Sequence, residues 1–296
     1  MISLNSKEVK SNLISKLRQE VESLSGKHQI VPGLAVVLVG DDPASAVYVK
    51  NKIKTCAELG INSIQKILPH TTSQTELLAV IEQLNSNPEI HGILCQIPLP
   101  RHLNEEEIIH SITPLKDVDC FHPFNLGLLV SGTPRYIPCT PFGILQILKY
   151  NQIAISGKNV VILGRGHTVG RPLSILLSAK GLDATVTLCH SKSTQVQSIC
   201  KSADILIAAI GIPKLVNRDY VKAGATVIDV GINRISDGTA SDKMILAGDV
   251  DFDDIKEIAY AATPVPGGVG PMTITMLMAN TINAARINSG LLPITF

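Results

Sequence analysis

Short apolar runs alternate with helical segments along this chain, and this alternation restricts its fold more than any other feature. Two of the clearest runs are residues 33–40 (GLAVVLVG) and 92–97 (GILCQI). A strand with one solvated face alternates apolar and polar side chains, whereas these runs are almost continuously apolar, as in sheets covered on both faces. The sequence therefore predicts an α/β fold with parallel sheets flanked by helices.

A second series of strands and helices begins after an irregular segment at residues 114–138, which contains several glycines and prolines. With 296 residues, the chain is long enough for two hydrophobic cores. We predict a first domain at residues 1–139 and a Rossmann-type dinucleotide-binding domain at 140–270, with a cleft between them. The last apolar helix, within residues 271–296, is expected to pack back on the first domain.

The composition argues against several classes of function. The formal net charge is +1 and only 3% of the residues are aromatic, so nothing indicates nucleic acid or a membrane as a partner. The six cysteines form no C-x-x-C pair, which argues against a metal site and favours free thiols in a reducing compartment. We therefore expect a cytoplasmic protein without a bound metal.

Residues 42–60 carry the start and stop signals of a helix. Asp42 suits the N-cap, Pro43 the first turn and Gly60 a left-handed exit. Helical periodicity predicts one apolar stripe and an opposite polar side. The stripe comprises Ala46, Val49, Ile53, Cys56 and Ala57, and the polar side comprises Asn51, Lys54, Thr55 and Glu58.

Lys52 falls on the shoulder of this predicted stripe, with Tyr48 one helical turn before it. Two interpretations are open. In the first, the ammonium group reaches water while the methylene groups cover apolar surface. In the second, the amine is desolvated, which lowers its pKa and suits it to acid–base chemistry.

A glycine-rich turn follows the predicted strand at residues 159–163. Its glycines are Gly164, Gly166 and Gly170, and the third lies one residue later than in the usual dinucleotide-binding pattern. Glycines at such a turn let the backbone approach a pyrophosphate at the following helix N-terminus. An ordinary structural turn is the alternative.

The end of the next strand bears on the choice of cofactor. NAD-binding folds place an acidic residue there to bind the ribose hydroxyls, but this strand ends in CHSKS at residues 189–193. Hydroxyl groups such as that of Ser191, the amine of Lys192 and the upstream Arg165 suit a 2′-phosphate instead. The sequence therefore favours NADP over NAD.

Two further segments carry polar groups in places where ligands bind. Gln96 lies at the end of an apolar strand, and its amide has either a functional partner or a local backbone hydrogen bond. Residues 116–119 (KDVD) put two carboxylates in the irregular segment. Asp119 or its neighbour could accept paired hydrogen bonds from an amino-pyrimidine edge, unless both are solvated loop acids.

The loop at residues 263–273 (TPVPGGVGPMT) has an unusually specified backbone. Its prolines and glycines exclude regular structure, and it leads into an apolar helix. Such a loop can offer main-chain groups to a flat ligand, or it can be a structural linker.

Taken together, these motifs resemble those of the bifunctional methylenetetrahydrofolate dehydrogenase / methenyltetrahydrofolate cyclohydrolase family. The matches occur in the family's order and span residues 33 to 281. They are SxxYVxxK at 45–52, QIPLP at 96–100, KDVD at 116–119, PCTP at 138–141, CHS at 189–191, GDVDF at 248–252 and the loop at 263–273.

The resemblance implies two reactions. NADP⁺ takes a hydride from 5,10-methylenetetrahydrofolate, and water then opens the methenyl product to 10-formyltetrahydrofolate. It also implies that the first domain binds folate, that Lys52 is the catalytic lysine, that Tyr48 stacks on the substrate and positions Lys52, and that Gln96 tunes the lysine.

The resemblance also assigns binding residues. Asp119 is expected to hold the pterin, and Pro266, Gly267 and Gly268 to contact it. The expected cofactor contacts are Gly164, Arg165, Gly166, Ser191 and Ile232. The family suggests a homodimer, and tetrahydrofolate derivatives are the expected partners.

This chain departs from the family pattern at two positions. Gly166 stands where the family usually has serine, and Cys120 stands where it usually has glycine. The alternatives to a bifunctional enzyme are a monofunctional dehydrogenase and a non-catalytic folate or nucleotide sensor. The intact Lys52 counts against the sensor, because a pure binding protein has no need of a tuned amine.

Overall fold

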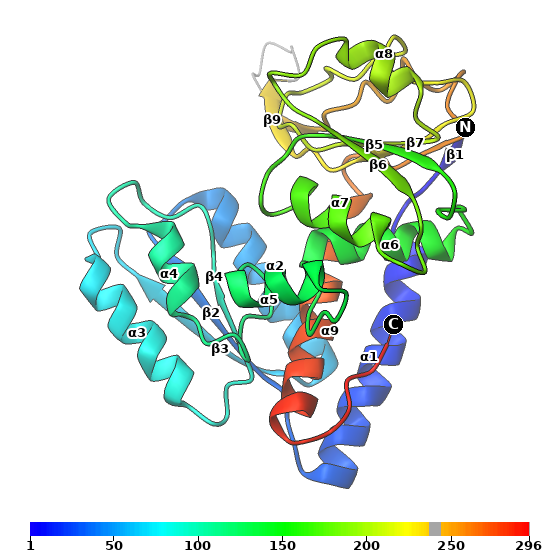
Figure 1. Ribbon diagram of the computed structural model, residues 1–296. Helices are drawn as coiled ribbons and strands as arrows, with labels where there is room; N and C mark the ends of the chain where they lie inside the picture. The colour runs from blue at the N-terminus through cyan, green and yellow to red at the C-terminus, as the bar shows by residue number, and fades with distance from the viewer. Residues whose placement is uncertain (237–243, 296) are drawn as a thin grey trace. The chain divides into compact units, whose positions relative to one another are not determined.

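The computed structural model describes residues 1–236 and 244–295 and divides into two compact units (Figure 1). We call Ser11–Cys139 with Ile274–Phe296 the first unit, of which Phe296 lies outside the described residues. We call Met1–Lys10 with Thr140–Thr273 the second unit.

Residues Met1–Lys10 cluster with the second unit, which differs from a first domain drawn at residues 1–139. The cause is the short strand β1 (Ile2–Ser3), which pairs in parallel with β11 (Ala261–Ala262). A strand of two residues has too few positions to show a hydrophobic period, so the sequence did not predict it.

The first unit is built on a parallel sheet in the order β3-β2-β4. The predicted strand at 33–40 is confirmed as β2, which is buried along its whole length. Helices α3 and α4 cover one face of the sheet and α2 covers the other (Figure 1). The elements are α1 (Lys7–His28), β2 (Gly33–Val39), α2 (Pro43–Leu59), β3 (Asn62–Leu68), α3 (Gln74–Ser86), β4 (Gly92–Cys95), α4 (Glu105–Ser111) and α5 (Pro123–Val130).

The predicted ends of α2 are confirmed. The Asp42 carboxylate accepts a hydrogen bond from the Ser45 N–H at 2.7 Å, and Pro43 occupies the first turn. Gly60 ends the helix in the left-handed conformation with φ of 75°. These local signals fix where α2 begins and ends, and so where Lys52 lies along it.

The second unit is built on a parallel sheet in the order β1-β11-β8-β7-β5-β6. Counted from β5, the strands lie in the order 2-1-3-4-5, a doubly wound order that binds ligands at the same kind of switch point as the six-stranded Rossmann order. Helix α7 lies on one face and α8 on the other (Figure 1). Its further elements are α6 (Cys139–Tyr150), β5 (Asn159–Leu163), α7 (Gly170–Ser178), β6 (Thr185–Cys189), α8 (Val196–Lys201), β7 (Ile205–Ala208), β8 (Thr226–Asp229), β9 (Asn233–Ser236) and β10 (Met244–Ala247).

The antiparallel pair of β9 and β10 was not predicted from the sequence. The last helix, α9 (Val269–Asn288), begins near the predicted position and is almost wholly buried. From Ile274 onward this helix belongs to the first unit.

Candidate functional site

Lys52 lies on the buried face of α2, and its side chain is only 7% exposed. The predicted apolar stripe is confirmed in part: Val49 and Cys56 are buried, whereas Ala46 and Ala57 are exposed. The buried positions follow one another at three- and four-residue spacing, as expected for one helix face. They are Ser45, Val49, Lys52, Cys56 and Leu59.

Thr55 was also predicted on the wrong side of α2. It is buried rather than solvated, and its hydroxyl donates to the Asn51 carbonyl oxygen at 2.9 Å. The periodicity of apolar residues located this face only in part, because polar side chains occupy the rest of it. Of the two interpretations of Lys52, burial favours the desolvated amine.

The Lys52 amine is held by Gln96, which directly follows β4. Lys52 Nζ donates to Gln96 Oε1 at 2.9 Å, and Gln96 Nε2 donates to the Ile97 carbonyl oxygen at 2.8 Å. The backbone bond fixes the orientation of the amide, so that its oxygen faces the amine. The sequence left open whether the Gln96 amide has a functional partner or a backbone hydrogen bond, and in the structure it has both, Lys52 and the Ile97 carbonyl oxygen.

Lys52 and Asp119 oppose the effect of burial on each other. Burial lowers the pKa of Lys52 below its ordinary value of 10.5, because the ammonium loses hydration, while Asp119 and Cys139 favour the charged form. Burial likewise raises the pKa of Asp119 above 3.8, and the Lys52 ammonium opposes that rise. The site is thus an amine and a carboxylate that each depend on the other to stay charged.

Lys116 has a structural role in the KDVD segment. Its amine donates to three backbone carbonyl oxygens at the end of α3, those of Leu84, Asn85 and Asn87, at 3.1, 2.7 and 2.7 Å. The carbonyl oxygens at a helix C-terminus lack intrahelical partners, so a lysine there satisfies them. The segment is anchored to α3 by this residue.

The two carboxylates of the segment are separated by their hydrogen bonds. Asp117 is buried and accepts from Phe121 N–H at 3.1 Å, His122 N–H at 2.9 Å and Asn125 Nδ2 at 2.8 Å, just before and within α5. Asp119 is half-buried, with the Cys139 side chain as a hydrogen-bond partner. Asp119 is therefore the carboxylate with room for a ligand.

Removing the Asp117 carboxylate is expected to destabilise the protein. Asp117→Ala leaves its three donors without their acceptor, and we expect a loss of about 3 kcal/mol in the free energy of unfolding. Urea unfolding measures this loss, with the exposed Asp219→Ala as the control that should lose less than about 0.5 kcal/mol. Equal losses in both variants would contradict the structural role of Asp117.

Two residues next to the site were not assigned a role from the sequence. Cys139 lies beside Asp119 and Lys52, and the PCTP motif was its only signal. Asn280 in α9 donates through Nδ2 to the carbonyl oxygens of Val118 and Ile137, at 2.8 and 2.9 Å. Asn280 lies far along the chain from its partners, so no local pattern could reveal it.

Cys120 keeps the backbone conformation expected of a glycine. Its φ is 62°, in the left-handed region that glycine adopts without cost and other residues adopt rarely. The family's usual glycine at this position therefore has a conformational reason, and the cysteine side chain in this chain does not prevent the same turn. Its thiol donates to the Tyr136 carbonyl oxygen at 3.3 Å.

Tyr48 lies one turn before Lys52 on α2 and is half-buried. Burial raises the pKa of its hydroxyl above 10.0, so the ring carries a neutral phenol at physiological pH. A half-exposed aromatic ring of this kind can pack against a flat ligand while its hydroxyl keeps a polar contact.

The turn between β5 and α7 fits a dinucleotide. A Cβ on Gly164 would lie 2.0 Å from the Ala209 carbonyl oxygen, and one on Gly170 would lie 1.9 Å from the Gly164 carbonyl oxygen. These two glycines permit the close packing of the turn, whereas a Cβ on Gly166 would meet nothing nearer than 4.0 Å. Gly170, the late third glycine, thus permits the close packing of helix and strand that the third glycine permits in the usual pattern.

The other predicted cofactor residues lie on the same unit and are exposed. They are exposed to solvent, as the 46% exposed fraction of Ile232 illustrates, and comprise Arg165, Gly166, Ser191 and Ile232. Ser191 follows β6, where the carboxylate of NAD-binding domains would stand. The end of β6 therefore offers hydroxyl and basic groups rather than an acid.

The loop predicted at 263–273 is shorter in the structure, because α9 already begins at Val269, and it is tied to the N-terminal segment. The Ser6 N–H and hydroxyl both donate to the Gly267 carbonyl oxygen, at 2.9 and 2.8 Å. Pro266, Gly267 and Gly268 belong to the second unit, as do the predicted cofactor residues. Lys52, Tyr48, Gln96 and Asp119 belong to the first unit.

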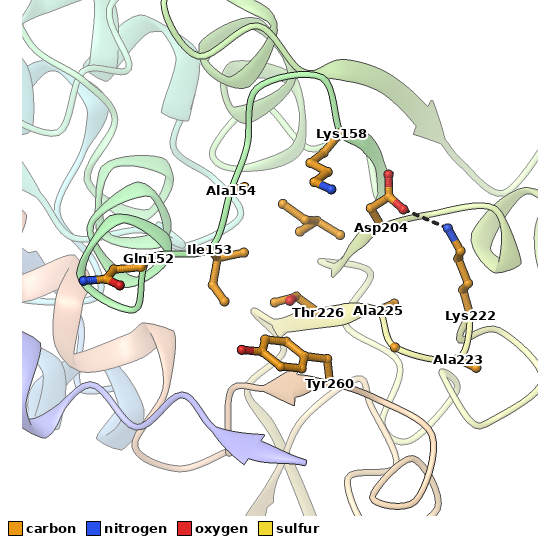
Figure 2. A pocket seen from close by; sticks show the side chains of 12 residues that line it. Gln152, Ile153, Ala154, Lys158, Asp204, Lys222, Ala223, Ala225, Thr226 and Tyr260 are labelled. Carbon is orange, nitrogen blue, oxygen red and sulfur yellow. Dashed lines mark hydrogen bonds and ion pairs between the residues drawn. The ribbon is translucent and has the colours of Figure 1, made fainter.

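A pocket of about 320 Å³ lies elsewhere on the second unit (Figure 2). It is lined by Ile205 and Thr226, which are the first residues of β7 and β8, and by the ion pair of Lys222 and Asp204 at 2.8 Å. None of the predicted site residues lines it. Ligands of doubly wound sheets bind at the carboxyl ends of the strands, so this pocket at the amino ends is not the candidate site.

Within residues 1–236 and 244–295, no group of three or more His, Cys, Asp or Glu side chains is arranged to hold a metal ion. No helix in the same part of the chain has the length and apolar character needed to cross a membrane.

Comparison with known proteins gives matches along nearly the whole chain. Residues 4–119 match the catalytic domain of the family described as tetrahydrofolate dehydrogenase/cyclohydrolase, and residues 138–289 match its NAD(P)-binding domain. The chain is 49% identical over 288 residues to the bifunctional protein FolD of Ruminiclostridium cellulolyticum, covering 97% of this chain and 98% of that protein.

Solved structures agree with these matches. The bifunctional enzyme FolD of Campylobacter jejuni superposes with a TM-score of 0.90 at 43% identity, covering 97% of this chain and 99% of that one. The FolD of Trypanosoma brucei, solved with NADP cofactor and an inhibitor, gives a TM-score of 0.92 at 35% identity, covering 98% of both chains.

Proposed function

Because this chain belongs to the tetrahydrofolate dehydrogenase/cyclohydrolase family, we propose that its buried Lys52 is the amine that serves its hydrolytic reaction. The chain is a bifunctional enzyme of one-carbon metabolism. It oxidises 5,10-methylenetetrahydrofolate to the methenyl compound with NADP⁺ and hydrolyses that product to 10-formyltetrahydrofolate. The observation that carries the proposal for Lys52 is its burial together with its hydrogen bond to Gln96.

The lowered pKa of Lys52 suits it to proton transfer. An amine whose charged form is destabilised spends more time neutral near physiological pH, and a neutral amine can accept the proton of an attacking water. Gln96 fixes the position of the nitrogen, so the amine does not need to be ordered again in each turnover. Tyr48 offers its ring to the flat substrate from the same helix.

Asp119 is proposed to hold the amino-pyrimidine edge of the pterin. A carboxylate accepts two parallel hydrogen bonds from such an edge only when it is ionised. Burial alone disfavours the ionised form. The Lys52 ammonium counteracts this effect while Lys52 is protonated, and the hydrogen bond with the Cys139 side chain also does so when Lys52 is neutral. Pro266, Gly267 and Gly268 are proposed to complete the substrate contacts through their backbone.

NADP is proposed to be held by Gly164, Arg165, Gly166, Ser191 and Ile232, and when bound it supplies the hydride acceptor of the oxidation. The close packing that Gly164 and Gly170 permit supports this placement, because it presents backbone N–H groups at the start of α7. The basic and hydroxyl groups near the end of β6 support NADP over NAD.

Arg165 is expected to distinguish the two cofactors. Arg165→Ala should lower kcat/KM for NADP⁺ by about 10-fold or more, because a charge-assisted contact to the 2′-phosphate is lost. The same variant should change kcat/KM for NAD⁺ by less than about 3-fold, since NAD lacks that phosphate. Equal losses with both cofactors would contradict the assignment of Arg165.

A spectrophotometric assay tests the oxidation. Purified protein mixed with methylenetetrahydrofolate and NADP⁺ should produce the methenyl compound, and added methenyl compound should then disappear faster than it does in buffer. Formation without accelerated hydrolysis would indicate a monofunctional dehydrogenase. Tight ligand binding without either activity would indicate a sensor.

The assembly and location of the protein are proposed from the family. We infer a cytoplasmic homodimer that binds tetrahydrofolate derivatives and has no nucleic-acid partner. Light scattering coupled to size exclusion tests the dimer: the expected mass is twice 31.6 kDa, and a mass of 31.6 kDa would contradict it.

A further inference from the structure

A buried carboxylate in the GDVDF motif joins two loops of the second unit. Asp249 is fully buried, and its Oδ2 accepts hydrogen bonds from the N–H groups of Ile210 at 2.7 Å and Gly211 at 3.0 Å. Its Oδ1 accepts from Asn233 Nδ2 at 3.0 Å. Ile210 and Gly211 follow β7, and Asn233 begins β9 shortly after β8. One side chain therefore fixes the loops at the carboxyl ends of two neighbouring strands.

A second buried carboxylate holds the segment that carries Asp249. Asp229, the last residue of β8, accepts from the N–H groups of Gly231 and Asp249 through Oδ1, both at 2.9 Å. It accepts from the Val250 N–H through Oδ2 at 3.0 Å. Burial raises the pKa of Asp229 to about 6 against the effect of these donors, so at neutral pH it remains an ionised acceptor.

Glycines on both sides let these carboxylates approach the backbone. A Cβ on Gly231 would lie 2.3 Å from Asp249 Oδ1, and a Cβ on Gly248 would lie 1.8 Å from Asp229 Oδ2. Because neither clash is relieved without moving a buried carboxylate, the arrangement of the two aspartates and two glycines permits little variation. The loops that Asp249 joins are accordingly held in one geometry.

The position of these loops relates them to one half of a dinucleotide. In a Rossmann-type sheet the pyrophosphate lies at the turn after the first strand, and the adenosine ribose lies at the end of the strand beside it. Here those strands are β5 and β6, and the sheet continues on the other side of β5 with β7 and then β8. The nicotinamide half must extend to that other side, over the loops that carry Ile210, Gly211 and Ile232.

We propose that Asp249 is a positioning residue for the nicotinamide half of NADP, acting through the Ile210–Gly211 loop and the segment of Ile232 and Asn233. The proposal rests on the proposed function, because it presumes that NADP binds at the carboxyl ends of β5 and β7. Asp249 itself is not proposed to touch a ligand. It orders the backbone against which the nicotinamide lies.

The choice of ligand separates this role from general structural support. Adenosine 2′,5′-bisphosphate carries the adenosine half of NADP without the nicotinamide. Asp249→Ala should weaken the binding of NADPH by about 10-fold or more, because three donors lose their acceptor and the two loops lose their common anchor. The same variant should bind the bisphosphate with unchanged affinity.

The experiment measures both dissociation constants by calorimetry or fluorescence, together with the melting temperature and the cyclohydrolase kcat. The cyclohydrolase kcat is expected to stay within about 3-fold of the wild type, since Lys52 and Gln96 belong to the first unit. Equal weakening of NADPH and the bisphosphate, or unchanged NADPH binding, would overturn the proposal.

Two further variants keep the test decisive if Asp249→Ala does not fold. Asn233→Ala removes only one of the three donors, and Asn233 is half-buried. This variant should weaken the binding of NADPH by about 3-fold and leave the binding of the bisphosphate unchanged. Asp249→Asn keeps one oxygen for Ile210 and Gly211, and its amide can donate to Asn233 if the Asn233 amide turns over. This variant should bind NADPH within about 3-fold of the wild type. A loss as large as that of Asp249→Ala would overturn hydrogen-bonded positioning.

Asp251→Asn is the matched control, because Asp251 lies in the same motif and its carboxylate makes none of these contacts. It should leave both affinities unchanged. Failure of the proposed function is seen separately, as a wild-type protein that binds NADPH no better than it binds the bisphosphate and oxidises no methylenetetrahydrofolate.

Discussion

Replacing Lys52 by methionine is expected to lower the cyclohydrolase rate by about 10²- to 10⁴-fold, the range that a positioned acid–base group contributes. Methionine keeps the length and apolar body of the side chain but has no proton to give or take. The rate of methenyltetrahydrofolate hydrolysis, corrected for the reaction in buffer, measures the effect.

Lys54→Met is the control for this variant, because Lys54 lies on the same helix with its side chain 74% exposed. It should hydrolyse the methenyl compound at the wild-type rate. A Lys52→Met enzyme that keeps more than about a tenth of the wild-type rate would remove Lys52 from the catalytic role.

Lys52→Met should be more stable than the wild type although it is less active. The pKa of Lys52 is lower in the folded protein than in the unfolded chain, so the unfolded chain binds more protons between the two values. The destabilising effect of Lys52 is therefore fully present below its folded pKa and disappears as the pH rises to about 10.5. The variant should be more stable than the wild type at neutral pH, with a gap that closes in alkaline solution.

Replacing Gly170 by alanine is expected to reduce NADP⁺-dependent oxidation by about 100-fold or more, because misplacing a binding group by an ångström has effects of that order. The added Cβ would lie 1.9 Å from the Gly164 carbonyl oxygen, and backbone cannot yield there without displacing the turn. The oxidation rate, the dissociation constant of NADPH and the cyclohydrolase rate are the measurements. Hydrolysis should persist, since its amine is in the first unit.

Gly166→Ala separates crowding from the mere addition of a methyl group. The Cβ added in Gly166→Ala would meet nothing nearer than 4.0 Å, so its free energy of unfolding should equal that of the wild type. Gly170→Ala should lose about 1–3 kcal/mol of the free energy of unfolding. A Gly170→Ala enzyme with wild-type affinity for NADPH would contradict the role assigned to this turn.

The ends of α2 could be predicted from the sequence, but the face that it buries could be predicted only in part. Asp42, Pro43 and Gly60 act locally, through hydrogen bonds and backbone angles that depend on a few neighbours. The buried face depends on what packs against the helix. Polar residues such as Lys52 and Thr55 are buried there because Gln96 and the Asn51 carbonyl oxygen satisfy them.

The KDVD segment shows the same division between local and distant information. Its sequence marked two carboxylates without distinguishing them, because their partners, Asn125 for Asp117 and Cys139 for Asp119, are set by the fold. The strand β1 was missed for a related reason: it is too short to carry a pattern, and it exists because β11 offers it an edge. The strands β2, β4 and β5 were predicted because their own apolar runs specify them.

A titration of Lys52 itself shows whether its buried amine is desolvated. Nitrogen-15 NMR of lysine side-chain amines, with Lys52→Met to assign the signal, gives its pKa in the folded protein. We predict a value below the ordinary 10.5, and a still lower value in Asp119→Asn, where the favourable charge is lost. A Lys52 that titrates at or above 10.5 in the wild type would contradict the account of a desolvated amine.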